Sequence, residues 1–318
     1  MRALIVTNMY PTPRRPALGS FVRDQIDALR RISGVELDVF AFAPGGPAAY
    51  VRGGVELARR HRRQQFDVVH AHFGLTLWPA LAARGGARAV TLHGTDLAHP
   101  RSRAITLGGL RFADLVGVVS EPLARQVPRW ATHDPVAVLP CGVDMRRFQP
   151  IPRGDARAQL GLDRERPYVL FPADPRRAEK RHDRALALAV REGVRLLTLG
   201  DVAPTEVPLW INSANAVLVP SEREGFGLAV LEALACDVPV LATPVGIAPE
   251  ALEGVPGTYC AAFDLEAWRE ALAPHLAADD PRVPGRPRAE QFSSDRMAAR
   301  LLQAWRRLAS ERPRGRPR

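Results

Sequence analysis

Residues 216–242 combine signals that strongly constrain the fold of this chain. The apolar run 216–219 has the length and character of a buried strand. A turn containing glycines follows it, then a helix-forming run that starts near Leu228, and then a second apolar run at 238–242. Strand, turn, helix and strand in this order are typical of a parallel sheet whose strands are joined by helices.

Two glutamates, Glu224 and Glu232, lie on either side of the point where this helix is expected to begin. The first turn of a helix leaves backbone N–H groups unpaired and partly positive, so it favours an anion such as phosphate. Carboxylates accept hydrogen bonds from hydroxyl groups. Phosphate and hydroxyls in one pocket describe a sugar nucleotide, and the segment predicts such a site. The alternative is a pair of solvated helix carboxylates without a ligand.

The rest of the chain alternates short apolar runs with helical patterns. This predicts an α/β protein with two doubly wound, Rossmann-like domains that face each other across a cleft, with ligands at the carboxyl ends of the strands. The expected domains are 1–150 and 167–310, the second including a terminal helix. The stretch 151–166 is polar and rich in Pro, Gly and Arg, which favours a linker. The basic tail 311–318 is expected to be disordered.

The expected strands and helices follow from runs of buried character and from helical periodicity. Strands are expected at 4–7, 35–42, 66–70, 89–92, 115–119, 136–139, 168–172, 194–199, 216–219, 238–242 and 258–260. Helices of the second half are expected at 183–191, 207–214, 228–235, 265–277 and 295–309. In the first half, a basic helix is expected at 55–65 and another helix at 75–83.

Composition narrows the function classes. Hydrophobic residues make up 46% of the chain, but no apolar run is long enough for a membrane-spanning helix. Residues 1–10 have the character of a strand and not of a secretory signal. The three cysteines are scattered, without disulfide-framework or metal-ligand spacing. These features together predict a cytoplasmic location.

The formal net charge is +10, and the basic residues are almost all arginine. Such a chain could meet nucleic acid, anionic lipid or phosphorylated substrates, although a GC-rich genome explains heavy use of Arg, Ala and Pro equally well. No surface with interleaved aromatic residues is apparent, so no nucleic-acid partner is expected. Peripheral contact with the anionic inner face of the cell membrane stays open.

The motif Glu224-Gly225-Phe226-Gly227, followed by Glu232 and then Ala-Leu-Ala-Cys, resembles the retaining glycosyltransferases of family four, which have the GT-B fold. Within that family, the chain is most similar to a subgroup that acts in bacterial surface polysaccharide assembly and includes the glycosyltransferases of teichuronic acid biosynthesis. Further matching stretches lie at 7–12, 19–25, 67–72, 92–96, 140–148, 170–181 and 206–210.

The resemblance implies a hexosyltransferase that moves a sugar from a nucleotide-diphosphate donor to a glycan or a lipid-linked acceptor, without metal or another cofactor. It implies that Glu224 binds the sugar hydroxyls, Glu232 the ribose hydroxyls and Lys180 the pyrophosphate. The histidine matching His93 faces the transferred sugar in the family, and the loop ending at Gly19 approaches donor and acceptor with its backbone.

The remaining donor contacts expected from the resemblance come from a turn and from a loop. The turn offers the backbone of Gly225, Phe226, Gly227 and Leu228. In the loop, the family often has an arginine five residues before the lysine, where this chain has proline. Arg176 or Arg177 is the candidate replacement, and a solvated loop is the alternative for both.

His70 and His72 alternate along an expected strand and should therefore share one face of the sheet. No third metal ligand is apparent, so both are interpreted as cleft-lining or structural residues. Two other classes compete with a transferase, namely a sugar-nucleotide 2-epimerase of the same architecture and a non-catalytic basic binding protein. The Glu224–Glu232 motif favours the transferase.

Overall fold

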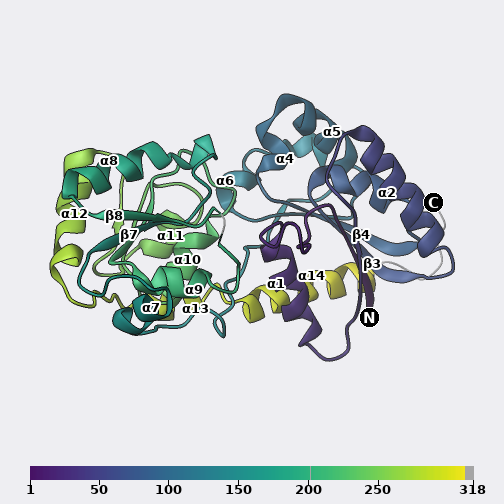
Figure 1. The fold of residues 1–318 in the computed structure, drawn as a ribbon. Helices are drawn as coiled ribbons and strands as arrows, with labels where there is room; N and C mark the ends of the chain where they lie inside the picture. The colour runs from purple at the N-terminus through teal and green to yellow at the C-terminus, as the bar shows by residue number, and fades with distance from the viewer. Residues whose placement is uncertain (201, 312–318) are drawn as a thin grey trace. The chain divides into compact units, whose positions relative to one another are not determined.

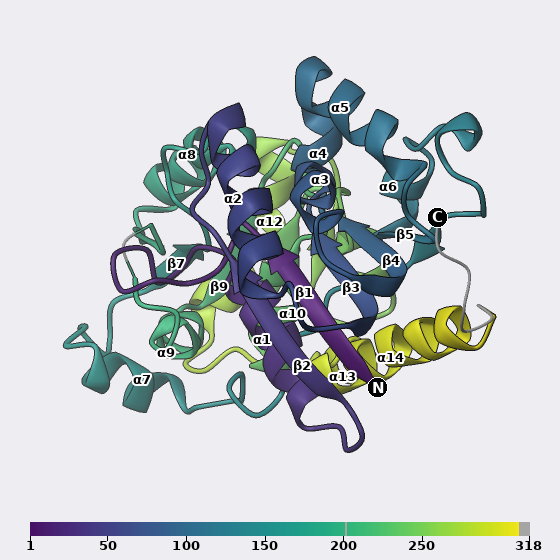
Figure 2. The same ribbon diagram turned by 90° about the vertical axis from the view of Figure 1, so that its right-hand side faces the viewer.

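The computed structural model describes residues 1–200 and 202–311, which form two compact units (Figures 1 and 2). The first unit comprises Met1–Gly142 and Ser294–Arg318, and the second comprises Val143–Ser293. Each unit holds one parallel sheet with helices packed on it. The tail for which disorder is expected lies outside the described residues from position 312 onward.

The sheet of the first unit has six parallel strands in the order β2-β1-β3-β4-β5-β6. Thr7 pairs with His72, and His72 pairs with Thr91, so β1, β3 and β4 end side by side at one edge. The strands are β1 (Arg2–Thr7), β2 (Glu36–Ala41), β3 (Phe66–His72), β4 (Gly85–Leu92), β5 (Leu115–Val118) and β6 (Ala137–Val138).

Helices α1 and α14 pack together against one face of this sheet (Figure 1). Alternate strand residues such as Ile5 and Val68 meet Ile26 of α1 and Trp305 of α14 there. Helix α3 contacts β1 and β3. The helices are α1 (Ser20–Arg30), α2 (Pro47–Arg60), α3 (Leu77–Ala80), α4 (Thr95–Ala98), α5 (Pro100–Leu110), α6 (Glu121–Ala124) and α14 (Ser294–Glu311), with 3₁₀ turns η1 (Gly74–Thr76) and η2 (Arg129–Ala131).

The second unit has a five-stranded parallel sheet in the order β11-β10-β9-β7-β8. Trp268 of α12 and Leu188 of α8 are fully buried against Val169 and Leu218 of the strands. The strands are β7 (Tyr168–Phe171), β8 (Arg195–Thr198), β9 (Ala216–Val219), β10 (Val240–Ala242) and β11 (Tyr259–Cys260). The helices are α7 (Arg153–Gln159), α8 (His182–Glu192), α9 (Val207–Ser213), α10 (Leu228–Ala235), α11 (Ala248–Leu252), α12 (Leu265–Ala277) and α13 (Arg286–Glu290), with the 3₁₀ turn η3 (Ala178–Lys180).

All eleven expected strands are present, with ends that differ by a few residues. The expected second-half helices are present too, whereas the helix expected at 55–65 begins at Pro47 and ends at Arg60. Helix α5 was not expected from the sequence. Within residues 1–200 and 202–311, the structure holds no helix with the length and apolar character needed to cross a bilayer.

The expected domain boundaries need two corrections. The terminal helix does not belong to the second domain, because Leu301, Leu302 and Trp305 of α14 are buried in the core that α1 forms in the first unit. The stretch 151–166 is not a free linker, because it contains α7 and is part of the second unit. Its Arg157 is only 1% exposed and donates hydrogen bonds to Ser213 O, Arg164 O and Asn215 Oδ1.

We predict that Trp305→Ala lowers the free energy of unfolding by about 3–5 kcal/mol, because it removes a fully buried indole from the core of the first unit. Chemical denaturation measures this change. Trp130→Ala is the control, since Trp130 is 62% exposed, and it should stay within about 0.5 kcal/mol of wild type. Equal, small effects of both substitutions would contradict the packing of α14 described above.

Candidate functional site

Two loops of the second unit lie together because the strands before them are neighbours. Strand β7 leads into η3, and β9 leads into the turn before α10, and these strands pair in the sheet. The backbone N–H of Glu222 donates to the carbonyl of Glu179 at 2.9 Å and ties the two loops together. The chain therefore brings residues some forty positions apart to the same carboxyl edge.

Lys180 and Glu224 form an ion pair across these two loops. The Lys180 ammonium donates to both carboxylate oxygens of Glu224, at 2.6 and 2.5 Å. The side chains are 15% and 7% exposed, so the pair is largely shielded from water. Ser221 Oγ adds a hydrogen bond of 2.8 Å to Glu224 Oε1. The two residues that the sequence singled out separately are thus in direct contact.

The turn before α10 has the backbone geometry of an anion site. Gly227 has φ 93° and precedes Leu228, the first residue of the helix. The first amides of a helix have no acceptor within it, so those of Leu228 and Ala229 are available to a ligand. The Val230 amide already donates to the Gly227 carbonyl at 3.1 Å. Phe226 is buried, and its carbonyl accepts a hydrogen bond of 2.7 Å from the Ile247 amide, which fixes the turn.

Gly246 supports this turn and was not singled out from the sequence. It has φ +60°, and a Cβ placed there would lie 2.3 Å from the Phe226 carbonyl oxygen and 2.8 Å from Glu224 Cβ. A glycine is therefore required for close approach as well as for its backbone angle. The available signal was the glycine that follows the apolar strand at 240–242 within Thr-Pro-Val-Gly.

Glu232 lies on the second turn of α10 and is half-buried. It stands four residues after Leu228, so both residues lie on the same face of the helix. Glu232 and the first residue of α10 are consequently placed on one side of the helix, one turn apart.

The two candidate arginines bind carboxylates of their own loop. Arg176 pairs with Asp174 at 2.8 Å, and Arg177 pairs with Glu179 at 2.6 Å. The bond from Arg176 holds the pKa of the Asp174 carboxyl below its usual value. Both arginine side chains are exposed, so neither is favoured by its burial as the replacement for the phosphate-binding arginine of the family.

Arg181 contacts different carboxylates from its neighbour Lys180. Its guanidinium pairs with Asp183 at 2.6 Å and also with Glu222. Lys180 is the single lysine of the chain, which otherwise uses arginine as its basic residue. This contrast distinguishes Lys180 in the sequence independently of the motif around it.

In the first unit, three histidines form a stacked column at the carboxyl ends of β3 and β4. His70 and His72 share one face, as predicted, and their rings stack at 4.9 Å with an interplanar angle of 11°. The ring of His93 continues the stack at 5.3 Å and 22°. His72 Nδ1 lies 3.1 Å from His93 Nε2, which is a hydrogen-bond distance.

His70 and His72 are fully buried and His93 is partly buried, which favours the uncharged form of all three rings. Burial lowers the pKa of His72 to about 4 and holds the pKa values of His70 and His93 well below their usual value. His70 accepts a hydrogen bond of 3.1 Å from Trp305 Nε1 and contacts Thr91 Oγ1 at 2.8 Å. The innermost ring is thereby fixed on both sides.

Asp96 holds the backbone around His93. Its carboxylate accepts hydrogen bonds of 2.6 Å from the amides of His93 and Gly74. Burial raises the pKa of this carboxyl, and the backbone bonds oppose that rise. The rings of Phe21 and Phe73 lie 4.8 and 5.2 Å from the His93 ring. Backbone bonds and aromatic contacts thus hold His93 in place.

Gly19 lies at the start of α1 in the same unit, two residues before Phe21. It has φ 65° in the left-handed region, and an added Cβ would lie 2.2 Å from the Met9 carbonyl oxygen. Only glycine fits this turn, so the residue has a structural requirement independent of any ligand. Among residues 1–200 and 202–311, no group of three or more His, Cys, Asp or Glu side chains could hold a metal ion.

Two family models match the chain, one almost entirely within the first unit and the other within the second. Residues 18–147 match Glycosyltransferase Family 4, and residues 170–277 match Glycosyl transferases group 1. A D-inositol 3-phosphate glycosyltransferase from Actinosynnema mirum is 30% identical, over 82% of this chain and 77% of that protein. One with the same description from Mycolicibacterium paratuberculosis is 29% identical, over 83% and 72%.

Solved structures share the fold at lower identity. Sucrose-phosphate synthase from Thermosynechococcus elongatus has a TM-score of 0.75 and 19% identity, covering 98% of this chain and all of that chain. Anabaena HepE in complex with UDP-glucose has a TM-score of 0.69 and 18% identity, over 95% of this chain and 99% of that one. The fold is therefore GT-B, with two Rossmann-like domains.

We predict that Gly246→Ala destabilises the second unit by clearly more than the roughly 1–2 kcal/mol that the left-handed backbone angle alone costs. The excess comes from the overlap with the Phe226 carbonyl. Gly254→Ala is the matched control, because its φ is +69° but nothing lies within 4 Å of the added Cβ. Denaturation of both variants compares them, and equal losses would mean that the turn adapts freely.

Proposed function

The chain belongs to glycosyltransferase family 4, and from this premise we propose that it is a retaining hexosyltransferase with a nucleoside-diphosphate sugar as donor. The acceptor is a hydroxyl of a glycan or of a lipid-linked saccharide in cell-surface polysaccharide assembly. The observation that carries the proposal is the shielded Lys180–Glu224 pair beside the N-terminus of α10.

This arrangement suits a departing diphosphate. Negative charge develops on the leaving group as the bond to the sugar breaks. Lys180 and the first-turn amides after Gly227 supply positive potential for that charge, without a metal ion. Glu224, released from the lysine, accepts hydrogen bonds from sugar hydroxyls, and Glu232 does so from the ribose. Arg176 or Arg177 adds charge near the phosphates when it leaves its own carboxylate partner.

His93 is the residue of the first unit proposed to contact the transferred sugar. It is neutral at pH 7 because burial lowers its pKa, so it offers a hydrogen bond and no charge. The backbone at Gly19, where no side chain fits, is proposed to approach donor or acceptor closely.

Two acceptor classes follow from different observations. The motifs favour a glycan or lipid-linked acceptor, whereas the relatives described as D-inositol 3-phosphate glycosyltransferases favour a phosphorylated polyol. We propose the first. Assays that pair UDP- and GDP-sugars with lipid-linked saccharides and with D-inositol 3-phosphate distinguish the two.

Acceptor-dependent release of free nucleoside diphosphate, persisting in EDTA, supports a transferase. An epimerised sugar nucleotide without such release would favour the epimerase.

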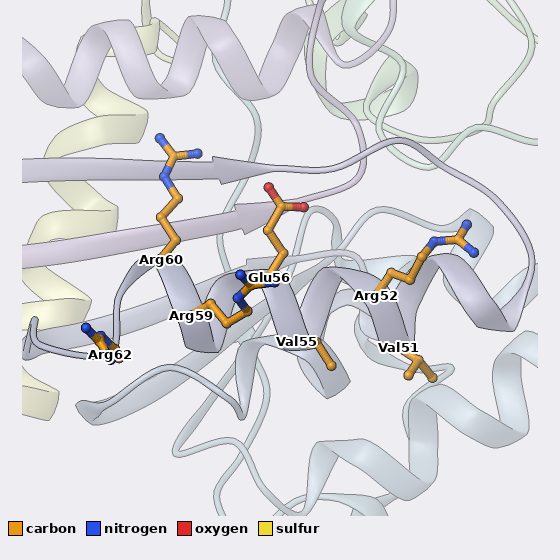
Figure 3. A pocket seen from close by; sticks show the side chains of 7 residues that line it. All are labelled: Val51, Arg52, Val55, Glu56, Arg59, Arg60 and Arg62. Atoms are coloured by element: carbon orange, nitrogen blue, oxygen red, sulfur yellow. The ribbon is translucent and has the colours of Figure 1, made fainter.

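A lipid-linked acceptor requires contact with a bilayer, and we propose that α2 provides it. A surface hollow of about 1020 Å³ lies along this helix and is lined by Val51, Arg52, Val55, Glu56, Arg59, Arg60 and Arg62 (Figure 3). Figure 3 shows Val51 and Val55 on one side of the helix and Arg60 on the other. The two valines are 68% and 56% exposed. Exposed apolar side chains among arginines suit an anionic membrane surface.

Aromatic residues near α2 support the same contact. Trp78 on α3 and Phe112 after α5 are 41% and 43% exposed and lie ring to ring at 5.7 Å. Trp78 Nε1 also donates a hydrogen bond to the carbonyl of Ile105. Residue Ile105 is itself 51% exposed. Helix α3 contacts both α2 and α5. Tryptophan with neighbouring apolar residues is typical of membrane interfaces.

We predict that Lys180→Ala lowers kcat by about 100-fold and donor affinity much less, because the lysine acts mainly on the developing diphosphate charge. Steady-state kinetics with the best donor measures both quantities. Arg181→Ala is the neighbouring control and should change kcat less than about threefold, since exposed ion pairs contribute little. Equal, small losses for both would remove Lys180 from the mechanism.

Lys180→Ala leaves Glu224 without its cationic partner, so a folding control is needed. Thermal unfolding of the variant shows whether the second unit remains folded. Lys180→Arg keeps the charge but changes its shape, because a planar guanidinium replaces a compact ammonium. We expect this variant to be folded and intermediate in kcat. A kcat as low as that of Lys180→Ala would point to geometry and not to charge.

We predict that the protein sediments with phosphatidylglycerol vesicles and not with phosphatidylcholine vesicles. Reversing Arg59 and Arg62 to glutamate should weaken binding by more than about 30-fold, from about 1 kcal/mol per basic residue near the surface. The control reverses Arg164 and Arg166, which are exposed in the second unit. If both double variants weaken binding equally, net charge and not α2 governs it.

A further inference from the structure

The two ring nitrogens of His72 have different surroundings. His72 is only 1% exposed, and the Nδ1 atom of His72 is 3.1 Å from His93 Nε2. Its Nε2 is buried and has no hydrogen-bond partner within the described part of the chain. The ring cannot turn freely, because it stacks between His70 and His93.

These surroundings select one tautomer. Burial keeps His72 neutral, so the ring has one N–H. With the proton on Nε2, a buried N–H would lack an acceptor, and such groups are rarer than buried acceptors that lack a donor. The proton therefore lies on Nδ1 and is donated to His93 Nε2. A neutral His93 that accepts at Nε2 carries its own proton on Nδ1.

We propose that His72 is a positioning residue, which fixes His93 in the neutral tautomer with its proton on Nδ1, so that His93 meets the substrate as a hydrogen-bond donor. His93 Nδ1 has no hydrogen-bond partner of its own among residues 1–200 and 202–311. The N–H at His93 Nδ1 can donate a hydrogen bond to a hydroxyl oxygen of a sugar. The same nitrogen cannot act as a base, because it already carries a proton. The substrate part of this inference rests on the proposed function; the tautomer does not.

Nitrogen-15 NMR of the histidine rings tests the tautomer on the full-length protein without substrate. Protonated and unprotonated ring nitrogens resonate at well separated shifts. We expect His93 to show protonated Nδ1 and unprotonated Nε2 in the wild type. In His72→Leu, where the donor is gone, we expect the His93 proton to redistribute toward Nε2. A wild-type His93 with protonated Nε2, or a spectrum unchanged in His72→Leu, would overturn the proposal.

Kinetics of a matched pair separates positioning from packing. Leucine and asparagine have nearly the same shape, but asparagine can place an amide N–H where His72 Nδ1–H lies. His72→Leu should lower kcat about tenfold with little change in donor KM. A tenfold loss corresponds to the contribution of one oriented hydrogen bond. His72→Asn should recover most of that loss. A role in packing alone predicts the opposite order, because burying an amide costs stability.

The outcomes distinguish this inference from the proposed function. A wild-type protein that turns over no sugar nucleotide would contradict the proposed function, and the ring-nitrogen spectrum would still decide the tautomer. An active wild type in which His72→Asn is no faster than His72→Leu would overturn the positioning role. Thermal unfolding of both variants confirms that the comparison is made between folded proteins.

Discussion

Parallel pairing of neighbouring strands determines where the chemistry of this chain lies. In the first unit, the pairing of Thr7 with His72 and of His72 with Thr91 makes three strands end together. A shift of one residue in β3 would turn His70 and His72 to the other face and dismantle the histidine column. In the second unit, β7 pairs with β9, so the loops that follow them meet as Lys180 and Glu224.

In the proposed reaction, each charge of the Lys180–Glu224 pair has a partner that the substrate replaces. A diphosphate takes over the ammonium while sugar hydroxyls donate to the carboxylate, so neither group is left buried and unpaired during the exchange. This favours lysine over arginine at position 180, because a compact ammonium on a flexible stem can move between partners more readily than a planar fork. The chain uses lysine only here, although it has +10 formal charge built almost wholly on arginine.

Local patterns were enough to predict most elements, including the helix Leu228–Ala235, because a glycine turn, an apolar strand and an apolar helix face mark it together. They could not predict that α7 is packed, since Arg157 is buried through bonds to carbonyls and an amide that lie elsewhere in the chain. The position of α14 was equally hidden, because an amphipathic helix does not specify its partner. The site, too, was only partly predictable from the sequence. The motif pointed to Lys180 and Glu224 separately, whereas their contact and the role of Gly246 depend on the fold.

The net charge of the chain is a poor guide to its partners, because arginines of this protein serve two different purposes. Arg282 and Arg286 donate to main-chain carbonyls such as those of Ile151, Cys236 and Phe148, so they hold loops of the second unit together. The arginines of α2 are exposed beside valines that are more than half exposed. The first kind would occur in a protein that never meets an anionic surface. The second kind forms the local cluster on α2, and it is this cluster, and not the total of basic residues, that supports the proposed membrane contact.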